Sequence, residues 1–177
     1  MQYLALFLPE KMMRYLATLF CLLLSLSTAA DAKGFNFTDH MGKKLTLSDY
    51  KGKWVLVNFW ATWCPPCLKE IPDLVSLYES RNDVVVIGIA MDYADTESII
   101  KFTDAMSIPY PIVFGTREIA SQLDELSMLP STYLFDPTGK PAARKVGILT
   151  REDIEKFIQS YSGTTHPAKA VDPPHAE

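Results

Sequence analysis

The chain has 177 residues, which fits one domain with short appendages, because a domain usually takes roughly 100 to 200 residues. Its 48% apolar and 21% charged residues are ordinary for a globular protein and exclude disorder or a fibrous repeat for the chain as a whole. The 17 Lys and Arg residues are outnumbered by 21 Asp and Glu residues, and no basic run could follow a phosphate backbone, so we expect no nucleic-acid partner.

The N-terminal segment has the layout of a secretory signal peptide. Lys11 and Arg14 form a positive region, residues 15–26 form a mostly apolar run, and small residues follow up to Ala32. The apolar run is short for a membrane span, which needs about 20 residues. We therefore expect residues 1–32 to direct export, either cleaved after Ala32 or kept as an N-terminal anchor.

A strand, a helix and a second strand are predicted in the first half of the chain. The runs 54–60 and 84–90 are almost continuously apolar, which is typical of strands that are covered on both faces. Between them, apolar residues recur on one helical face: Leu68, Ile71, Val75 and Tyr78. This order predicts a right-handed crossover between parallel strands.

The other predicted elements complete an α/β fold with a mixed central sheet flanked by helices, over residues 33–161. They are an edge strand at 35–37, a helix over about 95–106, a strand at 112–114, a short helix within 118–126, a hairpin of 131–135 and 142–146, and a last helix capped by Thr150. Residues 162–177 hold too few large apolar side chains to bury a core, so we expect a disordered tail.

Cys64 and Cys67 are the candidate reactive residues. They flank two prolines at the turn from a buried strand into a helix, which puts the first sulfur at the helix N-terminus. Free backbone N–H groups and the helix macrodipole stabilise a thiolate there. The second sulfur lies one turn inside the helix, so the pair can cycle between dithiol and disulfide. Pro65 and Pro66 fit the first helical positions, where a missing N–H costs nothing.

The stretch 57–72, with its Trp-Cys-Pro-Pro-Cys core, and Pro130 just before a predicted strand resemble the TlpA/ResA/DsbE branch of the thioredoxin superfamily. The resemblance covers about residues 34–161. It implies a thioredoxin-like fold and an exported thiol-disulfide oxidoreductase, in the periplasm or on the outer face of the cytoplasmic membrane. It also implies that the redox-active disulfide Cys64–Cys67 replaces any cofactor, and that no metal is bound.

The resemblance further implies that the protein reduces disulfides in proteins such as apocytochrome c or copper-site proteins and takes electrons from a membrane donor. Cys64 is the expected attacking thiolate and Cys67 the resolving thiol. Thioredoxin has a buried Asp where this chain has Asn58, and by resemblance Glu70 replaces it as the proton acceptor for Cys67. Spacing agrees, since Glu70 lies three residues after Cys67 on the helix.

Four more residues are expected to bind substrate. Pro130 is expected to be cis by resemblance, which would expose the backbone N–H and C=O of Leu129 to an extended substrate segment. Trp63 and Pro65 are expected to form an apolar contact surface next to the dithiol.

Other uses of Cys64 and Cys67 stay open at this point. A zinc site lacks a second cysteine or histidine pair in the sequence, and a permanently closed structural disulfide is the stronger alternative. A copper metallochaperone would use both sulfurs as soft ligands but lacks an ordered histidine. A peroxide-reducing redoxin of the same fold would place its reactive cysteine in a different motif.

Overall fold

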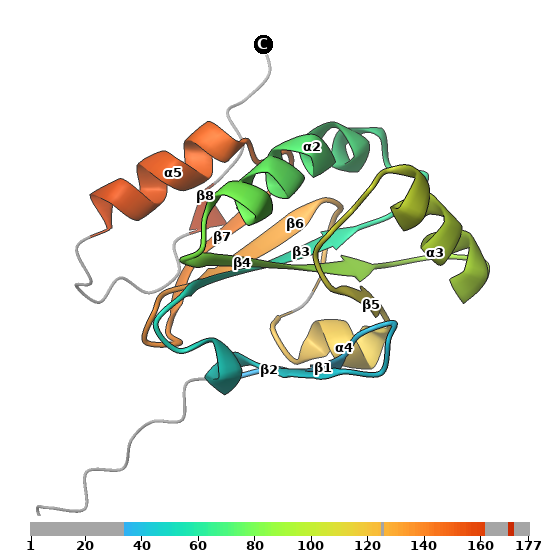
Figure 1. Cartoon of the computed structure of the whole chain (residues 1–177), viewed down its shortest axis with the longest axis horizontal. Helices are drawn as coiled ribbons and strands as arrows, with labels where there is room; N and C mark the ends of the chain where they lie inside the picture. Colours follow the sequence, from blue (N-terminus) through green and yellow to red (C-terminus); the bar gives the residue numbers. More distant parts are fainter. Residues whose placement is uncertain (1–33, 125, 162–169, 172–177) are drawn as a thin grey trace, which may run out of the picture. The chain divides into compact units, whose positions relative to one another are not determined.

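Strand β3 (Trp54–Trp60) lies at the centre of a mixed sheet (Figure 1). The structure is a computed structural model, and it describes residues 34–124, 126–161 and 170–171. The sheet of described strands has the order β5-β4-β3-β6-β7-β8. β4 and β5 run parallel to β3, and β6 runs antiparallel to it. The further bounds are β4 (Val84–Ala90), β5 (Ile112–Phe114), β6 (Ser131–Phe135), β7 (Pro141–Val146) and β8 (Ala170–Val171).

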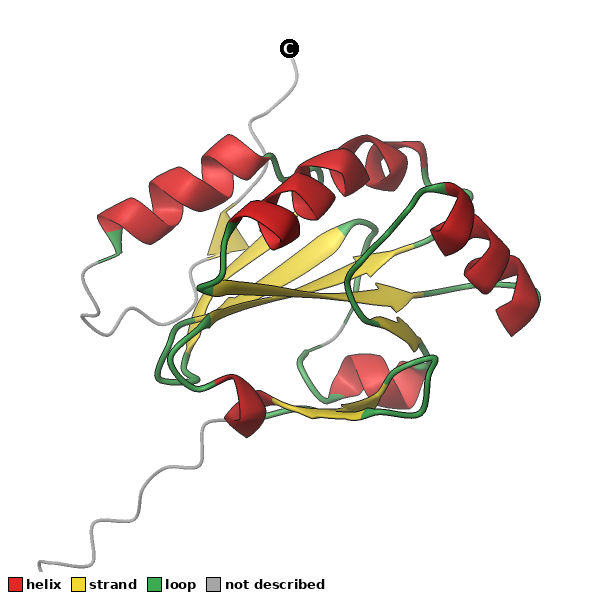
Figure 2. Cartoon of the chain, viewed as in Figure 1, coloured by secondary structure: helices red, strands yellow, loops and turns green. Residues whose placement is uncertain are grey.

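Helices cover one face of this sheet, and a hairpin covers the other (Figure 2). The helices of the first face are α2 (Pro65–Ser80), α3 (Thr96–Ala105) and α5 (Arg151–Ser160). The opposite face carries β1 (Asn36–Thr38), β2 (Lys44–Thr46), the short 3-10 helix η1 (Leu47–Tyr50) and α4 (Arg117–Ser121). The mixed sheet flanked by helices is the predicted fold class, and β3, α2 and β4 form the predicted parallel crossover.

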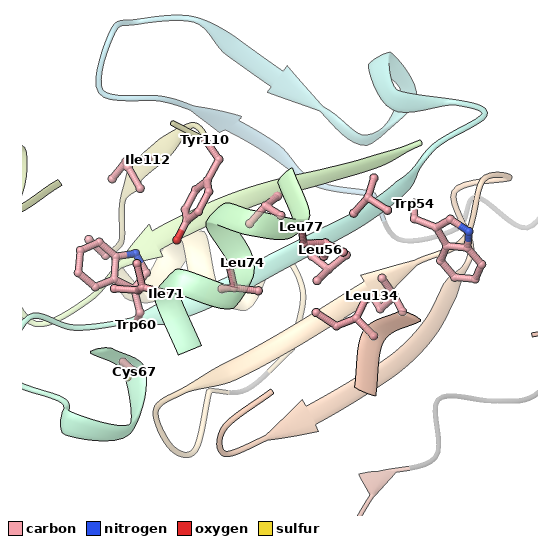
Figure 3. Packing of buried hydrophobic residues seen from close by; sticks show 14 of the residues in the cluster. Trp54, Leu56, Trp60, Cys67, Ile71, Leu74, Leu77, Tyr110, Ile112 and Leu134 are labelled. Carbon is pink, nitrogen blue, oxygen red and sulfur yellow. The ribbon is translucent and has the colours of Figure 1, made fainter. Parts of the chain in front are cut away.

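Successive side chains of β3 point to opposite faces of the sheet, so the strand contributes to a hydrophobic core on each face. Leu56 and Trp60 belong to the cluster under α2, whereas Val57 and Phe59 belong to the cluster under the hairpin. Figure 3 shows Leu74 and Leu77 of α2 beside Leu56, with Trp60, Ile71 and Tyr110 at the end of the cluster that lies nearer to Cys67. Asn58 follows the same alternation and points toward α2, where its side chain forms hydrogen bonds with the buried polar residues Glu70 and Thr132 in a largely apolar layer.

Two terminal predictions differ from the structure in part. The predicted edge strand at 35–37 does form β1, but it pairs with β2 in a separate antiparallel hairpin rather than with the central sheet. Of the expected tail 162–177, the described residues Ala170–Val171 form β8, which pairs in parallel with β7, and the remainder lies outside the described residues. A polar edge strand accepts such an extended partner because its outer N–H and C=O groups are otherwise unpaired.

The expected export segment 1–32 lies outside the described residues. Across the part of the chain that the structure does describe, no helix has the length and apolar character needed to cross a membrane.

Candidate active site

The two cysteines form a disulfide at the N-terminus of α2. Cys64 is the N-cap residue of the helix, and its Sγ accepts a hydrogen bond from the backbone N–H of Cys67 at 3.3 Å. Pro65 and Pro66 occupy the first two helical positions, as the sequence predicts, because those positions need no N–H donor. Cys64 is 3% exposed and Cys67 is fully buried, so Cys64 is the slightly more accessible residue of the pair.

Glu70 lies on α2, one helical turn beyond Cys67, and is 1% exposed. Its Oε1 accepts a hydrogen bond from Asn58 Nδ2 at 2.7 Å, and its Oε2 accepts one from the backbone N–H of Leu149 at 3.0 Å. Asn58 Nδ2 also donates to Thr132 Oγ1 at 3.0 Å. The carboxyl group therefore links the redox helix to β3, to β6 and to the loop before α5.

Burial raises the pKa of Glu70 to about 7, because water no longer stabilises the charged form, while the hydrogen bonds from Asn58 and Leu149 act in the opposite direction. Tyr110 is buried too, and burial followed by the charge of Glu70 raises the pKa of its hydroxyl. A carboxyl group that titrates near neutral pH can accept and return a proton at ordinary pH. Glu70 is thus not a solvated helix carboxylate.

The Leu129–Pro130 peptide bond is cis, as expected by resemblance. The register pairs Phe59 with Ser131, so Pro130 lies at the same end of β3 as the loop that leads to Cys64. Leu129 is partly buried, and neither its N–H nor its C=O has a hydrogen-bond partner among the described residues. This backbone is available to an extended segment that passes the dithiol.

Exposed apolar side chains are found on the loops around this end of the sheet. Trp63 is 60% exposed, and its Nε1 donates to the carbonyl of Asp92 at 3.1 Å, which fixes the ring beside the disulfide. Met128, next to Leu129, is 61% exposed. Ile148 is 40% exposed, and its loop is held near Pro130 by a hydrogen bond from Gly147 N–H to the carbonyl of Pro130 at 2.8 Å.

The turn at Gly147 has a φ of +89°, which favours glycine because a side chain would be strained there. Met128, Ile148 and Leu149 were not among the predicted site residues. Each stands in a loop without periodicity, and only the folded chain brings these loops to the dithiol. Pro65, predicted to contact substrate, is exposed at the start of α2.

No group of three or more metal-ligating side chains comes together among the described residues. Histidines 166 and 175 lie outside them.

The fold and the disulfide at the helix end define a thioredoxin-like thiol-disulfide oxidoreductase, and comparisons with known proteins agree. A family model described as AhpC/TSA family matches residues 28–143. A thiol-disulfide oxidoreductase ResA from Bacillus cereus is 37% identical over 132 residues, which cover 73% of this chain and 75% of that protein. The ResA of Geobacillus kaustophilus is 36% identical over 135 residues, with 76% of each chain covered.

Solved structures give the same result. A thioredoxin-family thiol:disulfide interchange protein from Chlorobium tepidum TLS has a TM-score of 0.64 at 26% identity, covering 71% of this chain and 91% of its own. A DsbF homologue from Corynebacterium diphtheriae has a TM-score of 0.65 at 29% identity, covering 72% and 84%. The chain belongs to the AhpC/TSA family and, within the thioredoxin fold, to the ResA-type thiol-disulfide oxidoreductases.

Proposed function

We propose that this oxidoreductase is an exported reductant of protein disulfides, in which Glu70 receives the proton of Cys67. The observation that carries the proposal is a buried carboxyl group, with a pKa of about 7, one helical turn beyond the buried cysteine. A resolving thiol must lose its proton before it attacks, and a buried thiol has no direct access to water as the acceptor. Glu70 supplies that acceptor inside the protein.

The reaction transfers two electrons from the dithiol to the substrate. The Cys64 thiolate attacks one sulfur of a substrate disulfide, and the other substrate sulfur leaves as a thiolate. Cys67 then gives its proton to Glu70 and attacks the Cys64 sulfur of the mixed disulfide. This expels the second substrate thiolate and leaves the Cys64–Cys67 disulfide, which is the state of the structure. A donor dithiol must then reduce the protein again.

Substrate is held as an extended segment beside Cys64. The N–H and C=O groups of Leu129 pair with its backbone, because both lack partners among the described residues. Trp63, next to Cys64 in the chain, and Met128, next to Leu129, supply apolar contact, since both are about 60% exposed. Substrates therefore carry an apolar residue close to the disulfide.

The protein acts in the periplasm or on the outer face of the cytoplasmic membrane. The signal-like segment 1–32 supports this location. Its substrates are protein disulfides such as those of apocytochrome c or copper-site proteins, and a membrane protein supplies its electrons. No cofactor besides the Cys64–Cys67 disulfide is needed for this exchange.

The decisive measurement is the reduction potential of the Cys64–Cys67 pair, obtained by equilibration with thiol-disulfide buffers. A reductant is expected to lie near thioredoxin, at about −270 mV. A value near that of a strong oxidant, about −120 mV, would reverse the proposed direction of electron flow. Expression with and without residues 1–32, followed by cell fractionation, tests the location.

A further inference from the structure

The side-chain amide of Asn58 forms hydrogen bonds through its nitrogen but not through its oxygen. Its Nδ2 donates both to Glu70 Oε1 and to Thr132 Oγ1, at 2.7 and 3.0 Å. Its Oδ1 is buried and has no hydrogen-bond partner among the described residues. Asn58 itself is fully buried, so bulk water does not reach that oxygen. A buried acceptor without a partner is uncommon and calls for a physical reason.

The present orientation of this amide suits only one form of Glu70. An ionised carboxylate accepts hydrogen bonds with both oxygens, so the N–H group of Asn58 is its proper partner. A protonated carboxyl group has an O–H that must donate. If the proton is on Oε1, that O–H faces another donor, and a buried donor without an acceptor costs about 1 to 3 kcal/mol.

We propose that Asn58 is a positioning residue whose amide turns over when Glu70 takes up a proton. After a half-turn about the last side-chain bond, Oδ1 stands where Nδ2 stood and accepts a hydrogen bond from Glu70 Oε1. Thr132 follows the change, because a hydroxyl can donate as well as accept. The turn exchanges the two hydrogen bonds that Nδ2 donates for two that Oδ1 accepts, so the amide keeps the same number of bonds and one of its edges lacks a partner in either orientation.

The other contacts of Glu70 hold it in place in both states. The backbone N–H of Leu149 donates to Oε2, which can be the carboxylate oxygen or the carbonyl oxygen of the acid. The titratable groups near this site are Tyr110, whose pKa is raised by burial and then by the charge of Glu70, and Cys67 on the same helix. Farther along α2, Asp73 accepts from the backbone N–H of Arg151 and lies at the contact with α5.

This inference rests on the proposed role of Glu70 as proton acceptor and explains how the site can accommodate the added proton. If the Asn58 amide could not turn, proton transfer from Cys67 to Glu70 would leave the O–H of Glu70 facing the N–H of Asn58, so that two donors would meet. An asparagine can donate to the carboxylate through its nitrogen and accept from the acid through its oxygen, so both the ionised and the protonated form of Glu70 are stabilised. An ionised aspartate at this position could not donate, and a leucine could do neither.

Nuclear magnetic resonance of the full-length protein in its disulfide form tests the turn directly. Cys67 does not titrate in that form, so the pH dependence belongs to Glu70. Above about pH 8, we expect strong proton–proton Overhauser contacts between the Asn58 amide and the Thr132 methyl group. Below about pH 5.5, they should weaken, with the midpoint shown by the Glu70 carboxyl carbon. Equal intensities across that titration would overturn the proposal.

Two variants connect the turn to catalysis. Glu70→Gln is the matched control for the spectra, and the pH dependence of the Asn58 signals should disappear in it. Asn58→Leu removes both the donor and the acceptor, but the bond lost by the ionised carboxylate is the stronger of the two, because hydrogen bonds to a charged group are roughly twice as strong as neutral ones. The pH–rate profile of disulfide formation should therefore shift upward by about one pH unit, a tenfold change in proton affinity. In the Glu70→Gln background, Asn58→Leu should shift nothing.

These outcomes separate this inference from the proposed function. If the Asn58 amide turns but resolution of the mixed disulfide does not depend on Glu70, the turn stands and the catalytic role of Glu70 fails. If resolution depends on Glu70 while the amide keeps its orientation, the proposed function stands and this inference fails. The spectra need only the unaltered protein and Glu70→Gln, so poor folding of Asn58→Leu would not prevent the decision.

Discussion

Glu70 is the residue on which the proposed chemistry depends, because its carboxyl group is buried behind the resolving cysteine. We predict that Glu70→Gln preserves the fold and the attack by Cys64 but slows resolution by about 10- to 100-fold, at the low end of the usual effect of a general base. Stopped-flow reaction of the reduced protein with a disulfide substrate, from about pH 5 to 9, measures this step. Superimposable pH–rate profiles would show that the proton leaves by another route.

The two sulfurs differ in access, and this difference predicts which one is trapped with substrate. Cys67 is fully buried inside the first turn of α2, whereas Cys64 is the N-cap residue of the helix and is 3% exposed. Cys67→Ser should accumulate mixed disulfides through Cys64, because the resolving step is missing. Cys64→Ser should accumulate none. Mass spectrometry of the trapped species identifies the linked cysteine, and preferential alkylation of Cys67 in the reduced protein would contradict the assignment.

The sequence predicts how Cys64, Cys67 and Glu70 are arranged, but not which groups form hydrogen bonds with Glu70 and Asn58. Cys64, Cys67 and Glu70 lie within seven residues, so helical spacing alone predicts their arrangement. The donor to Glu70 Oε2 is the backbone of Leu149, 79 residues away, and a backbone N–H leaves no mark in the sequence. The hydrogen bond of Asn58 to Thr132 is likewise fixed only by the register of β3 with β6.

At the scale of elements, the N-terminus of α5 carries the loop that contacts Glu70. Thr150 caps this helix in a reciprocal arrangement with Asp153, as the sequence predicts. Thr150→Ala should reduce the free energy of unfolding by about 1 kcal/mol, the usual cost of losing an N-cap. It should also disturb the neighbouring hydrogen bond from Leu149 to Glu70 and thereby raise the pKa of Glu70.

The matched control is Thr116→Ala, which removes the equivalent N-cap of α4 on the opposite face of the sheet. Urea unfolding should give a similar loss of stability for both variants, while only Thr150→Ala should change the titration of Glu70. A shift of that titration in Thr116→Ala, or its absence in Thr150→Ala, would mean that the loop before α5 does not position the carboxyl group.

Buried strands were predicted to the residue, and exposed ones were not. The bounds of β3 and β4 match the apolar runs, because a strand covered on both faces must be apolar throughout. β2 has only three residues, one of them buried, and β8 has two. Such short strands show no periodicity, and their pairing depends on which edge the folded chain leaves open.

At the scale of the whole molecule, burial of Glu70 should make stability depend on pH. Its pKa is raised from 4.5 to about 7, so the folded protein holds this proton more tightly than the unfolded chain does. Below about pH 4.5 the group is protonated in both states, and above about pH 7 it is ionised in both. The free energy of unfolding should therefore fall between these limits by about 3 kcal/mol, at 1.36 kcal/mol for each pH unit.

Urea unfolding of the disulfide form across about pH 4.5 to 8 measures this fall, with Glu70→Gln as the variant that should lack it. Other carboxyl groups have lowered pKa values, and their contribution to stability is complete near the bottom of this range. Both proteins share these groups, which are Asp49, Asp83, Glu118, Asp136 and Asp153. The difference between the two curves therefore reports Glu70 alone. Parallel curves would mean that this carboxyl group is as well solvated in the folded protein as in the unfolded chain. The proton acceptor proposed for Cys67 would then lack the burial that gives it a pKa near neutrality.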